Sequence, residues 1–264
     1  MKQFILIIGL AFALSGCKTT STNNTNASPI ARMSTNENKE VLSLAAPDAP
    51  AEIYQHMTDA QEKIRQGDLS DALDANIKPI IEHFNENYQN KYSRMFSARS
   101  KQESMLYTMN GLLQNGLKKQ NKNSDNVYSI PYVYALAFYL EGYINISLGR
   151  MSAAKKALNQ ALTLSPNNSL FSSELGHIYQ SEKRYIEALE IFEKSVKDAD
   201  LSPEEIKITE KGRALRGAGY SLIELNRLDE AEVKYNEALK INPDDKSSSN
   251  ELRYISGLRN KGNL

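Results

Sequence analysis

Small residues recur at a fixed interval along the second half of the chain. A glycine followed twelve residues later by an alanine marks each of three copies that align with one another: Gly142 and Ala154, Gly176 and Ala188, and Gly219 and Ala231. The first two copies lie 34 residues apart, whereas the third follows after 43 residues for both markers. Because both markers shift by the same nine residues, we expect a single insertion, in the segment DLSPEE that begins at Asp200. A fixed period of this length indicates three copies of one structural unit.

Each copy predicts two helices, one carrying the glycine and one carrying the alanine. Residues without large side chains at these two points let the paired helices approach closely, and proline ends the second helix in two copies, at Pro166 and Pro243. Four positions after the alanine, each copy has a large residue that we expect to fill the space between helices: Leu158, Phe192 and Tyr235.

The first half shows a weaker version of the same pattern. GDLSDALDANIKPII (67–81) predicts a turn between a helix at about 51–65 and a second helix at about 70–84, made irregular by Pro79. Residues 91–119 read as one longer amphipathic helix, followed by a polar loop, NKNSDN. Pro131 lies near the start of the next helix, and 247–262 reads as an N-capped, polar C-terminal helix.

This pattern resembles the tetratricopeptide repeat, a helical hairpin of 34 residues with glycine at position 8, alanine at position 20 and proline at position 32. The repeats are at about 135–168, 169–202 and 212–245, within a domain at 131–264 that ends in a capping helix, and 51–130 is a degenerate repeat-like region. The resemblance implies an all-α solenoid of helical hairpins wound as a right-handed superhelix.

The N-terminus predicts export and lipid attachment. Lys2 precedes an apolar stretch of about 11 residues, shorter than the ~20 that a membrane-spanning helix needs. The stretch ends in LSGC (14–17), which holds the single cysteine of the chain and resembles the lipobox of bacterial lipoproteins. The resemblance implies that residues 1–16 are a signal peptide and that Cys17 is lipidated. The alternative is an ordinary signal peptide followed by an unmodified thiol.

The segment after Cys17 predicts a flexible tether. Residues 17–50 are rich in Ser, Thr and Asn without apolar periodicity, which is typical of disorder. In bacterial lipoproteins a residue other than Asp after the cysteine permits sorting to the outer membrane, so Lys18 implies the periplasmic face of that membrane in a Gram-negative source.

Composition and motifs give little support to catalysis or nucleic-acid binding. The 32 Lys and Arg balance the 32 Asp and Glu, and the three histidines have no carboxylate or cysteine at ligand spacing. The motifs of zinc proteases, P-loop proteins and α/β-hydrolases are absent. The mature chain contains one Ser-x-x-Lys, Ser152 to Lys155, which resembles the motif of penicillin-recognising enzymes, but Ala154 within it is a repeat-packing residue. We expect no enzyme, no cofactor and no metal.

The candidate site is a binding groove. In the resembled family, positions 2, 5, 9 and 12 of each first helix line the concave face. These positions are Leu136, Tyr139, Tyr143 and Ile146, then Leu170, Ser173, His177 and Gln180, then Arg213, Arg216, Tyr220 and Ile223. They predict a groove with an aromatic end (Tyr139, Tyr143) and a basic end (Arg213, Arg216), although each tyrosine could instead pack between repeats.

The partner expected for this groove is a protein or peptide of the cell envelope. The carboxylate clamp of chaperone-binding repeats is not supported, because Tyr139, Tyr143 and Glu174 stand where it has Lys, Asn and Asn. The sequence therefore predicts a lipid-anchored, non-enzymatic scaffold. Two alternatives remain: a glycan- or small-ligand-binding lipoprotein, since tyrosines also stack on sugars, and an enzyme with its site in 85–130. Oligomeric state is left open.

Overall fold

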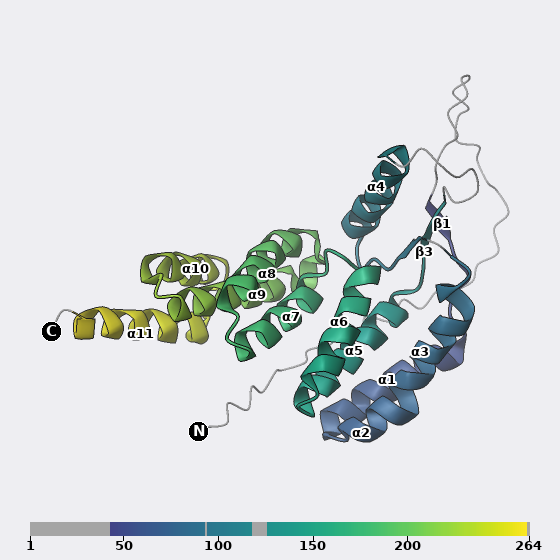
Figure 1. Cartoon of the computed structure of the whole chain (residues 1–264), viewed down its shortest axis with the longest axis horizontal. Coiled ribbons are helices and arrows are strands. Elements are labelled where there is room, and N and C mark those ends of the chain that lie inside the picture. Colours follow the sequence, from purple (N-terminus) through teal and green to yellow (C-terminus); the bar gives the residue numbers. More distant parts are fainter. Residues whose placement is uncertain (1–42, 93, 118–125, 263–264) are drawn as a thin grey trace. The chain divides into compact units, whose positions relative to one another are not determined.

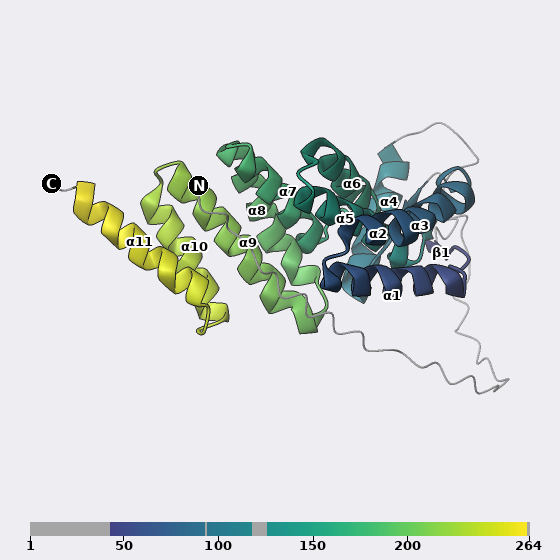
Figure 2. The same cartoon turned by 90° about the horizontal axis from the view of Figure 1, so that it is seen from below.

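The second half of the chain forms three consecutive helical hairpins (Figures 1 and 2). The structure is a computed structural model that describes residues 43–92, 94–117 and 126–262. The hairpins consist of α5 (Tyr132–Ser147) with α6 (Met151–Leu164), α7 (Ser169–Ser181) with α8 (Tyr185–Asp198), and α9 (Glu204–Glu224) with α10 (Leu228–Ile241). Each first helix packs on its own second helix, and successive hairpins also contact one another. The predicted all-α repeat fold is confirmed.

Glycine permits the close contact inside each hairpin. A Cβ atom added at Gly142 would lie 2.7 Å from Leu158, one at Gly176 would lie 2.8 Å from Phe192, and one at Gly219 would lie 2.7 Å from Tyr235. These distances are shorter than a carbon–carbon contact of about 3.5–4.0 Å. The alanines of the repeat, Ala154, Ala188 and Ala231, are all fully buried.

The turn inside each hairpin uses a residue in the left-handed backbone conformation. Gly149, Lys183 and Asn226 have φ angles of 72°, 59° and 58° and occupy the same position in the three repeats. Glycine adopts this conformation freely, whereas a side chain such as that of Lys183 makes it unfavourable.

The insertion before the third repeat is mostly helical. After α8 a short 3₁₀ turn, η3 (Ala199–Leu201), leads to Pro203, and α9 begins at Glu204, eight residues before the repeat starts at Gly212. The inserted residues therefore lengthen the first helix by about two turns at its N-terminal end.

Before the repeats, two antiparallel helical segments pack on α5. The first is α1 (Ala51–Gln66); the second runs through α2 (Leu69–Asp71), the π-helical η1 (Ala72–Ile77), α3 (Lys78–Phe84) and the π-helical η2 (Asn85–Gln89). The irregular helix predicted from Pro79 is present. The π-helical segments η1 and η2 precede and follow α3, which contains Pro79. Proline has no backbone N–H and cannot donate the regular helical hydrogen bond.

The long helix predicted at 91–119 is wrong in its first part. Strand β2 (Met95–Phe96) precedes helix α4 (Lys101–Leu117), and β2 pairs in parallel with β3 (Val127–Ser129), which also pairs with β1 (Ser43–Ala45). The register places Leu44 and Met95 opposite Tyr128. Helix α4 packs on β3, so this small sheet, which the sequence did not predict, gives the helix its support.

The last helix, α11 (Lys246–Gly262), packs on α9 and α10. Asp245 caps it by accepting hydrogen bonds from the backbone N–H groups of Ser247 and Ser248. None of the helices in the described part of the chain is long and apolar enough to cross a membrane. Cys17, the signal peptide predicted at 1–16, and most of the predicted tether and of the NKNSDN loop lie outside the described residues.

Candidate functional site

The first helices α5, α7 and α9 carry the predicted groove residues at equivalent positions, and we call these residues the first-helix row. The row consists of Leu136, Tyr139, Tyr143, Ile146, Leu170, Ser173, His177, Gln180, Arg213, Arg216, Tyr220 and Ile223. Most of these side chains are half-buried, Tyr139 and Ser173 are buried, and Tyr220 is exposed.

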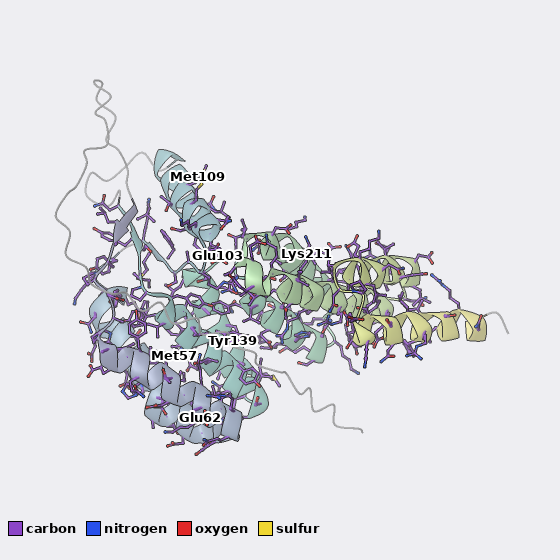
Figure 3. All side chains as sticks on the ribbon, turned by 180° about the vertical axis from the view of Figure 1, so that it is seen from behind. Met57, Glu62, Glu103, Met109, Tyr139 and Lys211 are labelled. Atoms are coloured by element: carbon purple, nitrogen blue, oxygen red, sulfur yellow. The ribbon has the colours of Figure 1, made fainter. Side chains whose placement is uncertain are left out.

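Tyr139 belongs to the interior. It is only 2% exposed (Tyr139 is labelled in Figure 3). Its ring stacks on Phe171 of α7 with 4.9 Å between centroids. For this residue the structure shows the packing role. Tyr143, one helical turn later, is half-buried, and burial raises the pKa of its hydroxyl, with a smaller contribution from the Glu174 carboxylate.

His177 sits at the centre of the row on α7. Its Nδ1 lies 3.0 Å from Oε1 of Gln180, and its ring meets the ring of Phe192 edge to face at 5.0 Å. Burial lowers the pKa of His177, which favours the neutral imidazole. Gln180 in turn donates from Nε2 to the carbonyl oxygen of Gly217 at 2.8 Å, so this pair of polar side chains also joins α7 to α9.

The prediction that Arg213 and Arg216 give one end of the row a free positive charge is wrong. Arg213 forms an ion pair with Glu174 of α7. Arg216 forms one with Asp245, 2.7 Å between Nη1 and Oδ2. Burial acts to raise the pKa of Asp245, but hydrogen bonds from Ser248 and Arg216 outweigh it and hold this pKa below its usual value. Sequence spacing did not reveal these acidic partners, because they come from a neighbouring repeat and from the cap of α11.

Tyr220 is the most open side chain of the row, with 42% of its surface exposed. Its ring centroid lies 6.4 Å from that of Tyr185 at the start of α8. Burial, followed by the nearby Glu224 carboxylate, raises the pKa of Tyr220 to about 12. Tyr254 of α11, 34 residues after Tyr220, is 54% exposed and takes the same position in the cap helix; the repeat period could have identified it.

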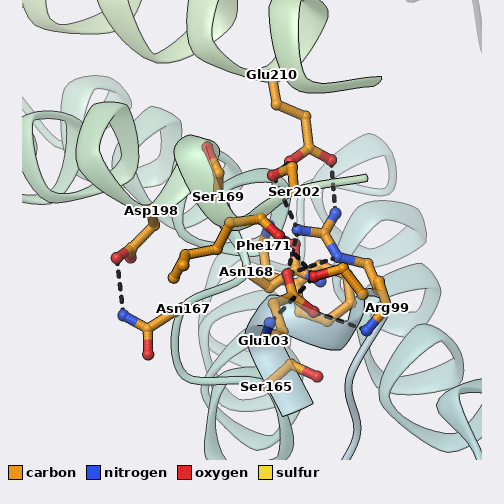
Figure 4. A network of polar contacts seen from close by, with 12 residues as sticks. Arg99, Glu103, Ser165, Asn167, Asn168, Ser169, Phe171, Asp198, Ser202 and Glu210 are labelled. Atoms are coloured by element: carbon orange, nitrogen blue, oxygen red, sulfur yellow. Dashed lines mark hydrogen bonds and ion pairs between the residues drawn. The ribbon is translucent and has the colours of Figure 1, made fainter. Parts of the chain in front are cut away.

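A second polar cluster, formed around Arg99, was missed by sequence reasoning (Figure 4). The Arg99 guanidinium donates to Glu103 Oε1 at 2.8 Å and to Glu210 Oε1 at 2.6 Å, and Ser202 donates to Glu210 at 2.7 Å. All three charged side chains are at most 6% exposed. The cluster fixes the segment before α4 to the inserted part of α9, and its burial gives it a structural role.

Ser100 continues this connection through two hydrogen bonds of its hydroxyl. Its hydroxyl donates to the carbonyl oxygen of Leu201 at 2.7 Å and accepts from the N–H of Glu103 at 3.1 Å. The second bond caps α4, and the sequence Ser100-x-x-Glu103 is the signal for such a cap. It could have placed the start of α4 correctly.

The chemistry considered from sequence gains no support in the described ranges. No group of three His, Cys, Asp or Glu residues there could hold a metal ion. Lys155 of the Ser-x-x-Lys segment forms an ion pair with Glu182, 2.7 Å between Nζ and Oε1.

Comparison with known proteins addresses the repeats. Family models of the tetratricopeptide repeat match residues 135–168, 173–197 and 212–245. Residues 41-end of MamA from Desulfovibrio magneticus RS-1 are 15% identical with a TM-score of 0.50, covering 80% of this chain and 87% of that one. The MamA RS-1 ArsTM double mutant is 16% identical with a TM-score of 0.50, covering 80% and 86%.

A smaller solved structure is similar to part of this chain. The N-terminal domain of stress-induced protein-1 from C. elegans is 19% identical with a TM-score of 0.42, covering 47% of this chain and 96% of that one. No curated protein matches the sequence. The chain thus carries tetratricopeptide repeats in its second half and has the helical-hairpin fold that these repeats build.

Proposed function

We propose that the chain is a non-enzymatic scaffold that binds a segment of another protein along the first-helix row. The observation that carries this proposal is the alignment of Tyr143, His177 and Tyr220 at one position in the first helices of three successive repeats, with Tyr220 open to solvent. Stacked repeats present such rows as extended surfaces for partners, and tyrosine provides large contact area at low entropic cost.

The row is organised before a partner arrives. The ion pairs of Arg213 and Arg216 and the hydrogen bonds of Gln180 join α7, α9 and the start of α11. A surface held in this way loses little conformational freedom on binding, which favours affinity. This rigidity supports recognition of an extended segment.

We further propose that Cys17 carries the lipid that holds the scaffold at the periplasmic face of an outer membrane. The support is the LSGC sequence and the apolar stretch before it. Two or three acyl chains anchor a protein stably, whereas one chain is marginal. Cys17→Ser should move the protein from the membrane fraction to the soluble envelope fraction. Continued membrane association of this variant would refute the anchor and leave the binding proposal intact.

The binding proposal is tested by crosslinking in intact cells and identifying the captured proteins. Tyr220→Ala should remove discrete partners that the wild-type chain captures. Tyr54→Ala is the matched control, because Tyr54 is also 42% exposed but lies on α1, away from the row. Partners retained by the Tyr220 variant, or lost equally in both variants, would contradict the proposed surface. A purified chain that retains muropeptides but no protein would favour the glycan-binding alternative.

A further inference from the structure

Two carboxylates, Glu224 and Glu251, lie beside the last residues of the first-helix row. Its two arginines are paired with Glu174 and Asp245, so these four charges cancel. Beyond them, Glu224 at the end of α9 and Glu251 of α11 form no ion pair within residues 43–92, 94–117 and 126–262. In these ranges, two carboxylates without an ion pair therefore lie at the end of the row where the sequence predicted free arginines.

The two unpaired carboxylates lie beside aromatic rings. Glu224 follows Tyr220 by four residues on α9, so the two side chains are neighbours on one face of the helix, and Glu251 lies on α11, which packs on α9. After burial, both carboxylates contribute to the raised pKa of Tyr220, and Glu224 also contributes at Tyr185, in agreement with this placement. Burial also raises the pKa of Glu251. We call Tyr185, Tyr220, Glu224 and Glu251 the Tyr220 corner.

The chain shows elsewhere what such a combination binds. The guanidinium of Arg184 lies over the ring of Tyr179, 4.4 Å from its centroid, and also pairs with Glu187 at 2.9 Å. A ring face and a carboxylate thus hold one cation together. The Tyr220 corner presents the same two kinds of group, with two rings and two carboxylates. Among the described residues, no cation–π contact or ion pair joins it to a cation.

We propose that the Tyr220 corner binds a lysine or arginine side chain of the protein segment that occupies the first-helix row. This inference rests on the proposed function and names the chemistry of its partner. The segment would lie along α7 and α9 with its cationic residue at Tyr220, next to the cap helix. A cation there gains from the ring face of an exposed tyrosine and from two carboxylates that form no ion pair in the described part of the chain.

The test is selection of random 12-residue peptides displayed on phage against the purified full chain. Peptides selected by wild type should contain Lys or Arg at one fixed position. The double variant Glu224→Gln, Glu251→Gln should lose this enrichment. Glu205→Gln, on the exposed first turn of the same helix α9, should keep it. The three substitutions remove charge without changing side-chain size, so they preserve the fold.

A selected peptide then shows how much its positive charge contributes to binding. Replacing its arginine with citrulline, which is neutral and nearly the same shape, should weaken binding to wild type about 5- to 20-fold, as expected for one cation–π contact and one or two ion pairs. The same replacement should change binding to the double variant less than twofold. An equal loss in both proteins would overturn the assignment.

Two other results separate this inference from the proposed function. Peptides that bind, lose binding in Tyr220→Ala and contain no preferred Lys or Arg would refute the cationic partner while supporting the row as a binding surface. Absence of any selected peptide, together with no partner in crosslinked cells, would refute both.

Discussion

Replacing Gly217 with alanine adds one methyl group where α9 crosses Phe192 of α8. The new Cβ would lie 2.2 Å from Cε1 of Phe192. The ring cannot move away easily, because it is fully buried and its other side faces Gly176, where an added Cβ would lie 2.8 Å away. The ring therefore occupies a slot that two glycines create.

Two effects of opposite sign set the size of the change. Alanine in place of glycine inside a helix stabilises by about 1 kcal/mol. Overpacking of a core costs about 1–3 kcal/mol, and a 2.2 Å approach to a ring held on both sides places Gly217→Ala at the upper end of that range. We expect a net loss of about 2 kcal/mol in the free energy of unfolding.

The assay is urea unfolding followed by helical circular dichroism, with the slope of the transition checked for equality between variants. Gly257→Ala is the control: this glycine lies in α11 with no atom within 4 Å of an added Cβ, so alanine should stabilise by up to about 1 kcal/mol. Adding Phe192→Leu to Gly217→Ala should recover part of the loss, because the smaller side chain leaves room for the methyl group. If Gly217→Ala stabilises the chain as Gly257→Ala does, the close contact is wrong.

Three further predictions concern other features. Lys183→Gly should raise the melting temperature, corresponding to about 0.5–1 kcal/mol, because it relieves the left-handed backbone of Lys183; a lower melting temperature would contradict this reason. Arg99→Met should cost about 3–5 kcal/mol in urea unfolding because it leaves two buried carboxylates unpaired, whereas Arg259→Met, at an exposed pair, should cost under about 1 kcal/mol; similar losses would argue against burial as the cause. Burial lowers the pKa of His177 below its usual 6.5, so the unfolded chain binds more protons than the folded chain. The contribution of His177 to the free energy of unfolding should therefore be fully present above about pH 6.5 and decrease as the pH falls below it. His177→Gln should reduce this pH dependence, and an unchanged slope of the free energy of unfolding against pH would contradict the prediction.

The repeats could be predicted from sequence because their packing is local. The contact of Gly176 with Phe192 joins residues of one hairpin, and the same contact recurs in the other two copies, so spacing alone reveals it. The start of α1 and the irregular helix around Pro79 were predictable for the same reason: each depends on residues within a few turns.

What could not be predicted depends on contacts between distant residues. The small sheet pairs Leu44, Met95 and Tyr128, which no periodic pattern connects. The sequence predicted Arg216 as part of a basic end because no repeat spacing connects it with Asp245, the cap of the next helix. Sequence identified which positions belong to the row, but the side chains that neutralise them had to be seen in space.

The bond between Arg99 and Glu210 spans 111 residues of sequence. Repeat arrays otherwise hold each unit mainly through its immediate neighbours, so their ends open independently. Local opening that begins at the C-terminus can release α11 and α10, whose contacts are chiefly with α9 and each other, without disturbing this bond. Opening that continues to the start of α9 must expose buried charges at once. Backbone amides of α10 and α11 should therefore exchange with solvent sooner than those of the first turns of α9, giving a gradient that stops within a single helix.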